Sequence, residues 1–260
     1  MESALNYYAV LRRIHETLRP NTYVEVGVHY GRAIVLAEPG TRCLGIDPEP
    51  MIEKTLPEST VIVESTSDDF FDHQTVADQL GQPADMGFID GRHLFEYALR
   101  DFRALERDST PGSVILFHDC HPKNVEWGSR GVRSGDVWKL LLALREFRPD
   151  LTVSTIEARP TGLGLVTGLD PTNRDLWDRY AEIMERIMPL EYTDVTELRD
   201  FPVNSVEPTW KNIRPLLPDA PYRAPGITDV VRVKGRRTRV YLRSKSKTQY
   251  RRWKRRLTRA

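Results

Sequence analysis

A chain of 260 residues, 40% of them hydrophobic, is long enough for one large α/β domain with additions or for two small domains. No run approaches the roughly 18–20 consecutive apolar residues that a membrane-spanning helix needs, and residues 1–20 lack the features of a secretory signal. We therefore expect a cytoplasmic protein. The two cysteines, Cys43 and Cys120, have no metal-binding spacing and predict buried or half-buried free thiols.

The net charge of +1 conceals an uneven distribution of charge along the chain. Residues 230–260 contain 14 of the 38 Lys and Arg residues and none of the 37 Asp and Glu residues, so residues 1–229 carry a net charge of −13. In a helix, Tyr250 and Trp253 would lie on one side of this basic segment. Residues 232–260 could therefore bind an anionic inner membrane surface, and nucleic acid is the less favoured ligand of similar chemistry. The alternatives are contact with the acidic body of the chain and a solubilising extension without a specific partner.

Hydrophobic patterns predict strands that alternate with helices along the first two thirds of the chain. Apolar spacing predicts a helix at residues 4–19, which Pro20 ends. The following strands are expected at residues 22–28, 42–46, 60–63, 84–89, 113–117, 151–156 and 164–166, with a turn at Pro111 and Gly112 before the fifth. Further helices are expected at residues 30–37, 67–80 (capped by Ser67 or Asp68), 93–107, 136–147 and 174–187.

This alternation predicts a doubly wound, Rossmann-like α/β fold with seven mainly parallel strands and helices on both faces. The last two strands are joined by a turn at residues 160–162, which is too short for a helical crossover, so one of them should run antiparallel. We expect an N-terminal helix at residues 1–20, the α/β domain at 21–170, an appended helix and proline-rich region at 171–229, and the basic tail at 230–260. The appended region either covers the substrate cleft or packs on the edge of the sheet.

Two features after the first two strands are typical of a nucleoside-binding site. Residues 25–31 read EVGVHYG, in which Gly27 permits a tight turn and Gly31 permits close passage of a ligand. Because His29 replaces the second glycine of a dinucleotide-binding motif, this segment alone indicates only a strand-to-helix turn. Asp47 directly follows the second strand, where its carboxylate can accept hydrogen bonds from both ribose hydroxyls, or can instead cap a helix.

Charged and polar side chains also follow the fourth and fifth strands. Asp90-Gly91-Arg92-His93 follows one strand, and His118-Asp119-Cys120-His121 follows the other. Because neighbouring parallel strands end at the same edge of a sheet, we expect two carboxylates and up to three imidazoles at one rim. Cys120 and His121 are expected only as neighbours of this cluster.

Four segments together, VEVGVHYG, GID, FIDGRHLFEYALRD and GSVILFHD, resemble the bacterial class I S-adenosylmethionine-dependent methyltransferases that O-methylate sugars and macrolide sugars. The resemblance covers roughly residues 20–168, and the D-G-x-H motif with the following His-Asp is its most specific part. It implies S-adenosyl-L-methionine as the cofactor. The implied donor site contains Glu25, Gly27 and Gly31, with Asp47 at the ribose, residues 64–67 including Ser65 near the adenine, and Asp90 near the methionine part.

The same resemblance implies catalytic and metal-binding roles. Asp90 is a metal ligand in metal-dependent members, and His93 falls where those members place a general base. His118 and Asp119 match the pair that completes the metal site, although the macrolide enzymes have two acidic residues there. Mg²⁺ would prefer the carboxylates, whereas Mn²⁺ or Zn²⁺ would also accept the imidazole. Without a metal, Asp119 could orient His93 or bind a sugar hydroxyl.

We therefore expect an O-methyltransferase that acts on a sugar hydroxyl of a glycan, glycolipid or glycosylated natural product. A sugar hydroxyl has a pKa far above 7, so its attack on the sulfonium methyl is helped by a base or by a cation. His93 suits the role of base because its unperturbed pKa is about 6.5, although it could also cap or pack under the helix that it begins. The alternatives are a phenolic or other small-molecule O-methyltransferase, and an inactive methyltransferase-like scaffold that binds nucleic acid through the basic tail. The sequence leaves the oligomeric state open.

Overall fold

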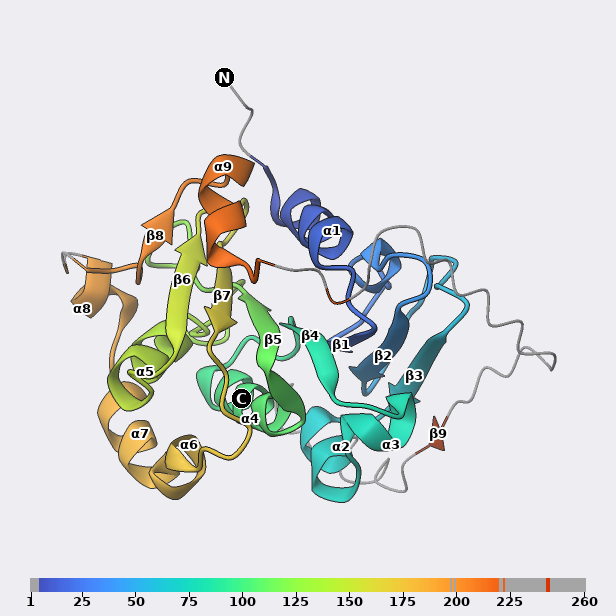
Figure 1. Ribbon diagram of the computed structural model, residues 1–260. Coiled ribbons are helices and arrows are strands. Elements are labelled where there is room, and N and C mark those ends of the chain that lie inside the picture. The colour runs from blue at the N-terminus through green and yellow to red at the C-terminus, as the bar shows by residue number, and fades with distance from the viewer. Residues whose placement is uncertain (1–4, 197, 199, 220–221, 223–241, 244–260) are drawn as a thin grey trace.

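A nine-stranded sheet with helices on both faces forms the centre of the protein in the computed structural model (Figure 1), which describes residues 5–196, 198, 200–219, 222, 242 and 243. The strand order is β8-β6-β7-β5-β4-β1-β2-β3-β9. The strands are β1 Thr22–Val26, β2 Arg42–Asp47, β3 Thr60–Glu64, β4 Ala84–Ile89, β5 Ser109–His118, β6 Thr152–Ile156, β7 Leu163–Thr167, β8 Ser205–Val206 and β9 Leu242–Arg243. Strands β1 to β7 correspond to the seven strands predicted from the sequence. The two-residue strands β8 and β9 lie at the two edges of the sheet. The predicted doubly wound α/β fold is confirmed.

Strand pairing brings the ends of the central strands level with one another. Strands β1 to β5 pair in parallel, and Val26 lies opposite both Ile46 and Ile89, while Ile89 lies opposite Phe117. Strand β7 runs antiparallel to both β5 and β6, as the short turn between β6 and β7 requires. The residues that immediately follow these paired positions therefore share one edge of the sheet: Gly27, Asp47, Asp90 and His118.

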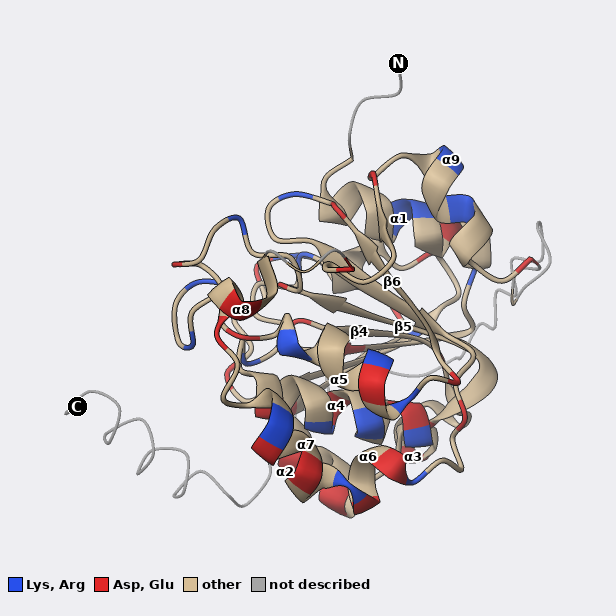
Figure 2. Ribbon diagram, turned by 90° about the vertical axis from the view of Figure 1, so that its left-hand side faces the viewer, with Lys and Arg blue, Asp and Glu red and all other residues tan. Residues whose placement is uncertain are grey.

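The helices form two layers, one on each face of the sheet (Figures 1 and 2). Helices α2 to α7 cover one face, and α1 and α9 cover the other. The helices are α1 Tyr7–Leu18, α2 Ser67–His73, α3 Val76–Leu80, α4 Phe95–Arg107, α5 Lys139–Phe147, α6 Asp175–Asp178, α7 Tyr180–Ile187, α8 Tyr192–Thr196 and α9 Trp210–Ile213, with 3₁₀ turns η1 Ile34–Leu36 and η2 Arg214–Leu216. Each layer has its own hydrophobic core, so both faces of the sheet are buried, as expected for parallel strands.

Helix α1 forms where the sequence pattern predicts it. The side chain of Asn6 accepts a hydrogen bond from the backbone N–H of Ala9, which caps the first turn. Val10, Ile14 and Leu18 are fully buried, and this spacing of four residues places them on one face, against the sheet. Burial of each such side chain contributes about 1.5–3 kcal/mol to stability. Within the described part of the chain, none of the helices combines the length and apolar character needed to cross a membrane.

Two of the predicted helices between β1 and β4 are wrong in detail. The helix expected at residues 30–37 is only the 3₁₀ turn η1, because His29 and Gly31 have left-handed backbone conformations, with φ of 46° and 75°. The helix expected at residues 67–80 is divided into α2 and α3. Thr75 interrupts it by capping α3 in a reciprocal capping box with Asp78. The N-cap of α2 is Thr66, one residue before the predicted cap.

Two later expectations also need correction. Pro111 and Gly112 do not form a turn before the fifth strand but lie within β5, where the pairing register with β4 shifts between Ala84 and Met86. The single helix expected at residues 174–187 is divided at Arg179 into α6 and α7. The hydrophobic side of this region, including Leu176 and Ile183, still packs on the core.

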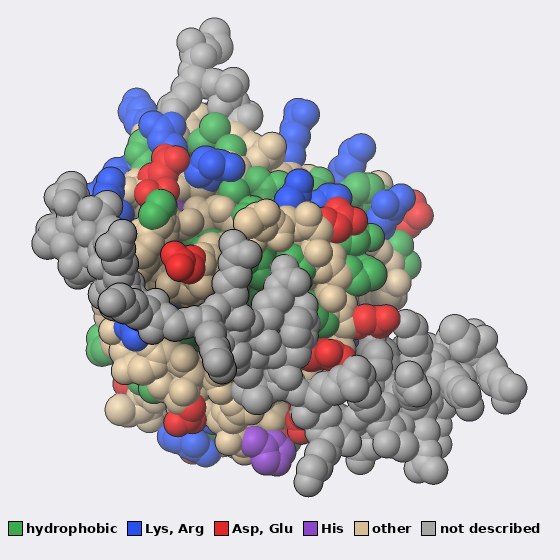
Figure 3. Space-filling view, turned by 90° about the vertical axis from the view of Figure 1, so that its right-hand side faces the viewer, with side chains coloured by type: hydrophobic (Ala, Val, Ile, Leu, Met, Phe, Trp, Pro, Cys, Tyr) green, Lys and Arg blue, Asp and Glu red, His purple; other side chains and the backbone are tan. Residues whose placement is uncertain are grey.

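The basic segment at residues 230–260 lies outside the described residues except for Leu242 and Arg243. These two residues form β9, which pairs in parallel with β3 and places Arg243 opposite Glu64. The side of the molecule that Figure 3 faces shows hydrophobic, basic and acidic side chains interspersed where described residues are visible. The expected membrane or nucleic-acid contact of residues 232–260 and the four domain boundaries remain predictions from the sequence.

Candidate active site

The turn after β1 passes directly against the turn after β4. The backbone N–H of Asp90 donates a hydrogen bond of 2.8 Å to the carbonyl of Val26. Gly27 has a φ of +88°, and a Cβ at this position would lie 2.2 Å from the carbonyl oxygen of Asp90. A side chain at Gly27 therefore cannot be accommodated without moving one of the two turns. Gly31 has a φ of +75° but ordinary space around it, so only its backbone conformation favours glycine.

Asp47 is held by the backbone of the same turn. Its Oδ2 accepts a hydrogen bond of 2.8 Å from the N–H of His29, and its Oδ1 accepts one of 2.8 Å from the N–H of Glu49. Because each carboxylate oxygen can accept a further hydrogen bond, Asp47 can still receive two hydroxyl groups. This geometry suits the ribose-binding role predicted from the sequence.

Glu25 lies buried beneath this turn and is bonded to Tyr23. The hydroxyl of Tyr23 donates a hydrogen bond of 2.8 Å to Oε2 of Glu25, and the ring of His15 packs edge-on against Tyr23 with centroids 4.5 Å apart. Burial raises the pKa of Glu25 well above its usual range, and the hydrogen bond from Tyr23 only partly opposes this. Glu25 remains a predicted donor-site residue whose protonated form is favoured by its surroundings.

Ser65 follows β3 and lies beside Asp47. Its backbone N–H donates a hydrogen bond of 3.1 Å to the carbonyl of Asp47, and its Oγ donates to the carbonyl of Thr66 at 3.0 Å. The structure thus brings Gly27, Asp47 and Ser65 to the same edge of the sheet. Their contact with a donor molecule stays a prediction.

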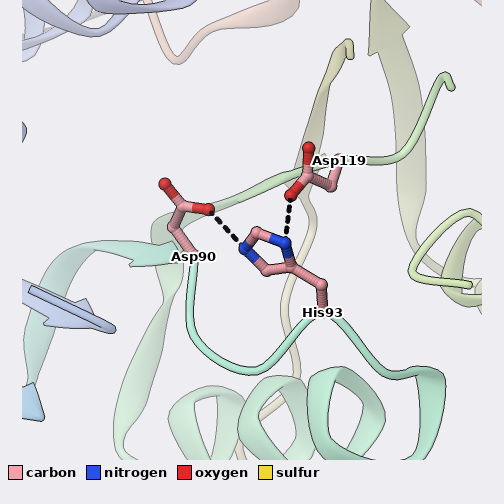
Figure 4. A group of neighbouring side chains, drawn as sticks. All are labelled: Asp90, His93 and Asp119. Atoms are coloured by element: carbon pink, nitrogen blue, oxygen red, sulfur yellow. Dashed lines mark ion pairs between the residues drawn. The ribbon is translucent and has the colours of Figure 1, made fainter. Parts of the chain in front are cut away.

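Four titratable side chains from the ends of β4 and β5 lie together, and Figure 4 shows three of them, Asp90, His93 and Asp119. His93 places Nε2 3.5 Å from Oδ1 of Asp90 and Nδ1 3.0 Å from Oδ2 of Asp119. His118 places Nδ1 3.3 Å from Oδ1 of Asp90 and 3.4 Å from Oδ1 of Asp119. The four residues singled out from the sequence therefore form one cluster, in which only the His93 side chain is substantially exposed, at 41%.

The close contacts shift the pKa values of the cluster. Burial disfavours the charged form of His93, but the hydrogen bond to Asp90 and the charges of Asp119 and Asp90 outweigh burial and raise its pKa to about 9. Burial likewise opposes the charge of His118, and Asp90 again outweighs it, so the pKa of His118 is raised. Burial would raise the pKa of Asp90, but the two imidazoles lower it. The cluster thus stabilises positive charge on both imidazoles and negative charge on Asp90.

The structure adds two side chains that the sequence reasoning missed. The hydroxyl of Thr161 donates a hydrogen bond of 2.5 Å to Oδ1 of Asp119 and lies 3.3 Å from Nε2 of His118. The ring of Tyr7 stacks on that of His118 with centroids 4.0 Å apart. Thr161 could have been found, because a strand antiparallel to β5 must begin near the end of β5. No sequence signal connected Tyr7 with this site.

Cys120 and His121 are neighbours of the cluster, as expected. Cys120 is fully buried and packs in the hydrophobic core, and burial raises the pKa of its thiol. The N–H of His121 donates a hydrogen bond of 2.7 Å to the carbonyl of Thr161, which fixes the turn before β7. Both predicted free thiols, Cys43 and Cys120, are buried.

The donor set of the cluster fits a divalent cation. Asp90, His93 and Asp119 each offer one ligand atom, and these atoms all lie within 4.8 Å of one another. Oδ2 of Asp119 is buried and receives no hydrogen bond, because the N–H at Nδ1 of His93 is directed to the carbonyl of Arg133 at 2.8 Å. The sequence suggested His118 as the third ligand, and Nδ1 of His118 lies 3.3 Å from Asp90 and 3.4 Å from Asp119, so both His93 and His118 stay candidates for this position. Two carboxylates and one imidazole suit Mn²⁺ better than Mg²⁺.

Comparison with known proteins agrees with this arrangement. Residues 24–120 match a family described as a methyltransferase domain. The matched range runs from β1 to the end of β5 and contains every predicted donor-site and cluster residue. The uncharacterized protein y4gI of Sinorhizobium fredii (strain NBRC 101917 / NGR234) is 25% identical over 72% of this chain. The alignment covers 20% of that protein, so this chain spans about a fifth of its length.

Two solved structures are also similar to this chain. The cofactor-bound protein Rv0187 from MTB has a TM-score of 0.53 and 15% identity, over 65% of this chain and 83% of that one. The O-methyltransferase TomG from Streptomyces achromogenes, in complex with SAM, has a TM-score of 0.46 and 18% identity, over 62% and 78%. At this level of identity, the likeness to Rv0187 shows a shared fold.

Proposed function

We propose that the chain is a class I S-adenosylmethionine-dependent methyltransferase that transfers the methyl group to a hydroxyl of a sugar, in a glycan, a glycolipid or a glycosylated natural product. The match of residues 24–120 to a methyltransferase domain supports this proposal. The observation that carries this proposal is the position of His93. Its ring lies between two aspartates, beside the turn that holds Gly27 and Asp47, and its Nε2 lies on the most exposed side chain of the cluster.

The proposed reaction is a direct displacement at the methyl carbon. The acceptor oxygen forms a bond to this carbon, the carbon–sulfur bond breaks, and its electron pair stays on the sulfur of S-adenosylhomocysteine. The hydroxyl proton moves to Nε2 of His93, because Nδ1 already donates to the carbonyl of Arg133. Alignment of oxygen, methyl and sulfur supplies much of the catalysis, because the sulfonium is itself a reactive methyl donor.

For this step Nε2 must be free of its proton. The pKa of His93 is raised to about 9 in the ligand-free protein, so its ring is then largely charged at neutral pH. A positively charged sulfonium nearby would disfavour the imidazolium and lower this pKa. Binding of the donor would therefore convert His93 toward the form that accepts a proton.

The polarity of the site supports a sugar over a phenol as the acceptor. The accessible groups of the cluster are the imidazole of His93 and the carboxylate of Asp90, both of which can hydrogen-bond to sugar hydroxyl groups. The aromatic ring at the cluster, that of Tyr7, is already stacked on His118. A phenolic acceptor would be better served by a hydrophobic, aromatic-lined pocket. The phenolic O-methyltransferase remains the second candidate.

We further propose that a divalent cation, Mn²⁺ or Mg²⁺, binds at the cluster, because the ligand atoms there suit such an ion. Asp90 and Asp119, with His93 as the third ligand, would hold the ion. When bound, it would lower the pKa of the acceptor hydroxyl and so supply the activation that a base supplies without it. His93 cannot ligate through Nε2 and accept a proton there at the same time, so the metal-bound and metal-free forms would use this residue differently.

The experiment that tests the proposal has two stages. Calorimetric titration of the protein with S-adenosylmethionine, and separately with NAD, would first establish the cofactor. Transfer of a radiolabelled methyl group to a panel of sugars and phenols, with and without Mn²⁺, would then identify the acceptor class. We expect binding of S-adenosylmethionine alone and labelling of sugars. A folded protein that does not bind the donor would contradict the proposal and favour an inactive scaffold, and labelling of phenols only would favour the second candidate.

A further inference from the structure

We infer that the acceptor sugar carries a negative charge, a carboxylate or a phosphate, and that Lys123 and Arg133 bind it. Both residues lie in the loop between β5 and α5, hereafter the 122–135 loop. This inference rests on the proposed function, because it names the chemical class of the acceptor for the same site.

The 122–135 loop packs directly on the segment that carries the candidate base. The carbonyl of Arg133 accepts a hydrogen bond of 2.8 Å from Nδ1 of His93. Two residues further on, Gly135 has a φ of +59°, and a Cβ at this position would lie 1.8 Å from the carbonyl oxygen of His93. The backbone of Arg133 is therefore fixed against His93, and its side chain begins beside the base.

The loop is fixed by contacts to its own ends and to neighbouring helices. Oγ of Ser134 donates a hydrogen bond of 2.7 Å to the carbonyl of Trp127, and the indole N–H of Trp138 donates one of 2.9 Å to the carbonyl of Gly128. The hydroxyl of Tyr192 donates to the carbonyl of Pro122 at 3.1 Å. The exposed side chains of the loop thus stand on a preformed surface, which lowers the entropic cost of binding a ligand.

Two basic side chains of this loop, Lys123 and Arg133, lie over the same aromatic ring, and the described residues include no carboxylate partner for either. Nζ of Lys123 lies 6.0 Å from the ring centroid of Trp127, and Cζ of Arg133 lies 5.1 Å from it. Neither exposed cation forms an ion pair with any carboxylate that the structure describes, including Glu126 in the same loop. Cation–π contact at an exposed site contributes only about 0.5–1 kcal/mol, which leaves most of both charges to interact with a ligand.

The third cation of the loop, Arg130, has a structural role. Arg130 lies 3.0 Å from Oδ2 of Asp136 and also pairs with Glu96, so its charge is neutralised within the protein. Residues 1–229 carry a net charge of −13 and as a whole repel anions. Two cations on the loop that packs against His93 would offset this repulsion for an acceptor that binds there. Figure 2 shows basic as well as acidic residues in the loops beside α8.

The test compares charged and neutral ligands of the same shape. Calorimetry of the full-length chain with S-adenosylhomocysteine present would measure binding of methyl glucuronide, glucose 1-phosphate and uncharged methyl glucoside. The variants are Lys123→Gln and Arg133→Gln, which remove the positive charge but keep a polar side chain and the backbone carbonyl of residue 133. Arg174→Gln is the matched control, because Arg174 also lies over a tryptophan, Trp177, at 5.4 Å but at the N-cap of α6 and outside the loop.

We expect at least one charged ligand to bind about tenfold or more tightly than methyl glucoside, since a charge-assisted contact contributes about 1.5–3 kcal/mol. Either loop variant should lose most of this preference, and Arg174→Gln should keep it. The two charged ligands distinguish a carboxylate from a phosphate. Equal or undetectable binding of charged and neutral sugars, or an undiminished preference in both loop variants, would overturn the inference. Preferential binding without methyl transfer to any sugar would instead overturn the proposed function and leave the anion site intact.

Discussion

The backbone carbonyl of Arg133 accepts a hydrogen bond of 2.8 Å from Nδ1 of His93. A carbonyl can only accept, so this contact fixes the tautomer of the neutral ring, with the proton on Nδ1 and the lone pair on Nε2. Oδ2 of Asp119 lies 3.0 Å from the same Nδ1 and stabilises positive charge on the ring without receiving its hydrogen. The carbonyl of Arg133 therefore determines which nitrogen of His93 can accept a proton, and the carboxylates of Asp90 and Asp119 raise the pH at which it can do so.

The first prediction concerns the pH dependence of the metal-free protein. The pKa of His93 is raised to about 9, so below this pH the ring is charged and cannot accept a proton. With EDTA present, kcat/KM for S-adenosylmethionine should rise with pH and level off above about 9, because this ratio reports the enzyme without bound donor. His93→Gln should lower kcat about 10²–10⁴-fold and remove this rise. A pH-independent kcat/KM between pH 7 and 10 would contradict the assignment.

The second prediction concerns Asp47 and the affinity for the methyl donor. Asp47→Asn keeps the size of the side chain but loses the charge that would accept the two ribose hydroxyls. Loss of charge-assisted hydrogen bonds of about 1.5–3 kcal/mol should weaken S-adenosylmethionine binding roughly 10- to 100-fold in calorimetry. Acceptor binding should change little. Circular dichroism provides the control, because Asp47 also accepts hydrogen bonds from His29 and Glu49, and a melted turn would invalidate the comparison.

The sequence predicted the sheet and the members of the site because both depend on strong local signals. Each of β1 to β7 is a short apolar run bounded by turns or helices, and parallel strands necessarily place Asp47, Asp90 and His118 at one edge. The sequence reasoning missed the features that depend on an unusual backbone conformation. The left-handed conformations of His29 and Gly31, which limit the helix after β1 to a 3₁₀ turn, are set by the contact with neighbouring segments and not by helix propensity.

The sequence reasoning also missed contacts between segments that lie far apart in the chain. Tyr7 reaches His118 because α1 packs across the sheet, and no spacing in a single sequence records this. The structure adds His93 as a candidate metal ligand beside the predicted His118. His118 has its Nε2 near Thr161 and its Nδ1 near both aspartates, and His93 brings a nitrogen to the same two carboxylates.

The third prediction compares the two glycines after β1. Gly27→Ala would place a Cβ 2.2 Å from the carbonyl oxygen of Asp90, so the turns after β1 and β4 must separate. We expect a loss of stability of roughly 1–3 kcal/mol, a lower Tm and loss of donor binding. Gly31→Ala should cost about 1–2 kcal/mol through its left-handed backbone alone and should retain donor binding, since its surroundings leave ordinary space. Equal loss of donor binding in both variants would contradict the proposed contact between the two turns.

The fourth prediction concerns the cation site of Asp90, His93 and Asp119. Mn²⁺ added to the metal-free protein should bind with an affinity measurable by calorimetry or electron paramagnetic resonance, and Asp119→Asn should weaken it about 10-fold or more, because one of two carboxylate ligands loses its charge.

Asp178→Asn, which changes an exposed carboxylate on α6, provides the control for this experiment and should leave Mn²⁺ binding unchanged. His118→Gln separates the two candidate ligand sets. If His93 is the third ligand, His118→Gln should retain most of the Mn²⁺ affinity, whereas a large loss would show that His118 turns toward the ion as the sequence first suggested. Equal Mn²⁺ affinity in the parent protein and in Asp119→Asn would exclude this cluster as the binding site and leave proton acceptance by His93 as its chemistry.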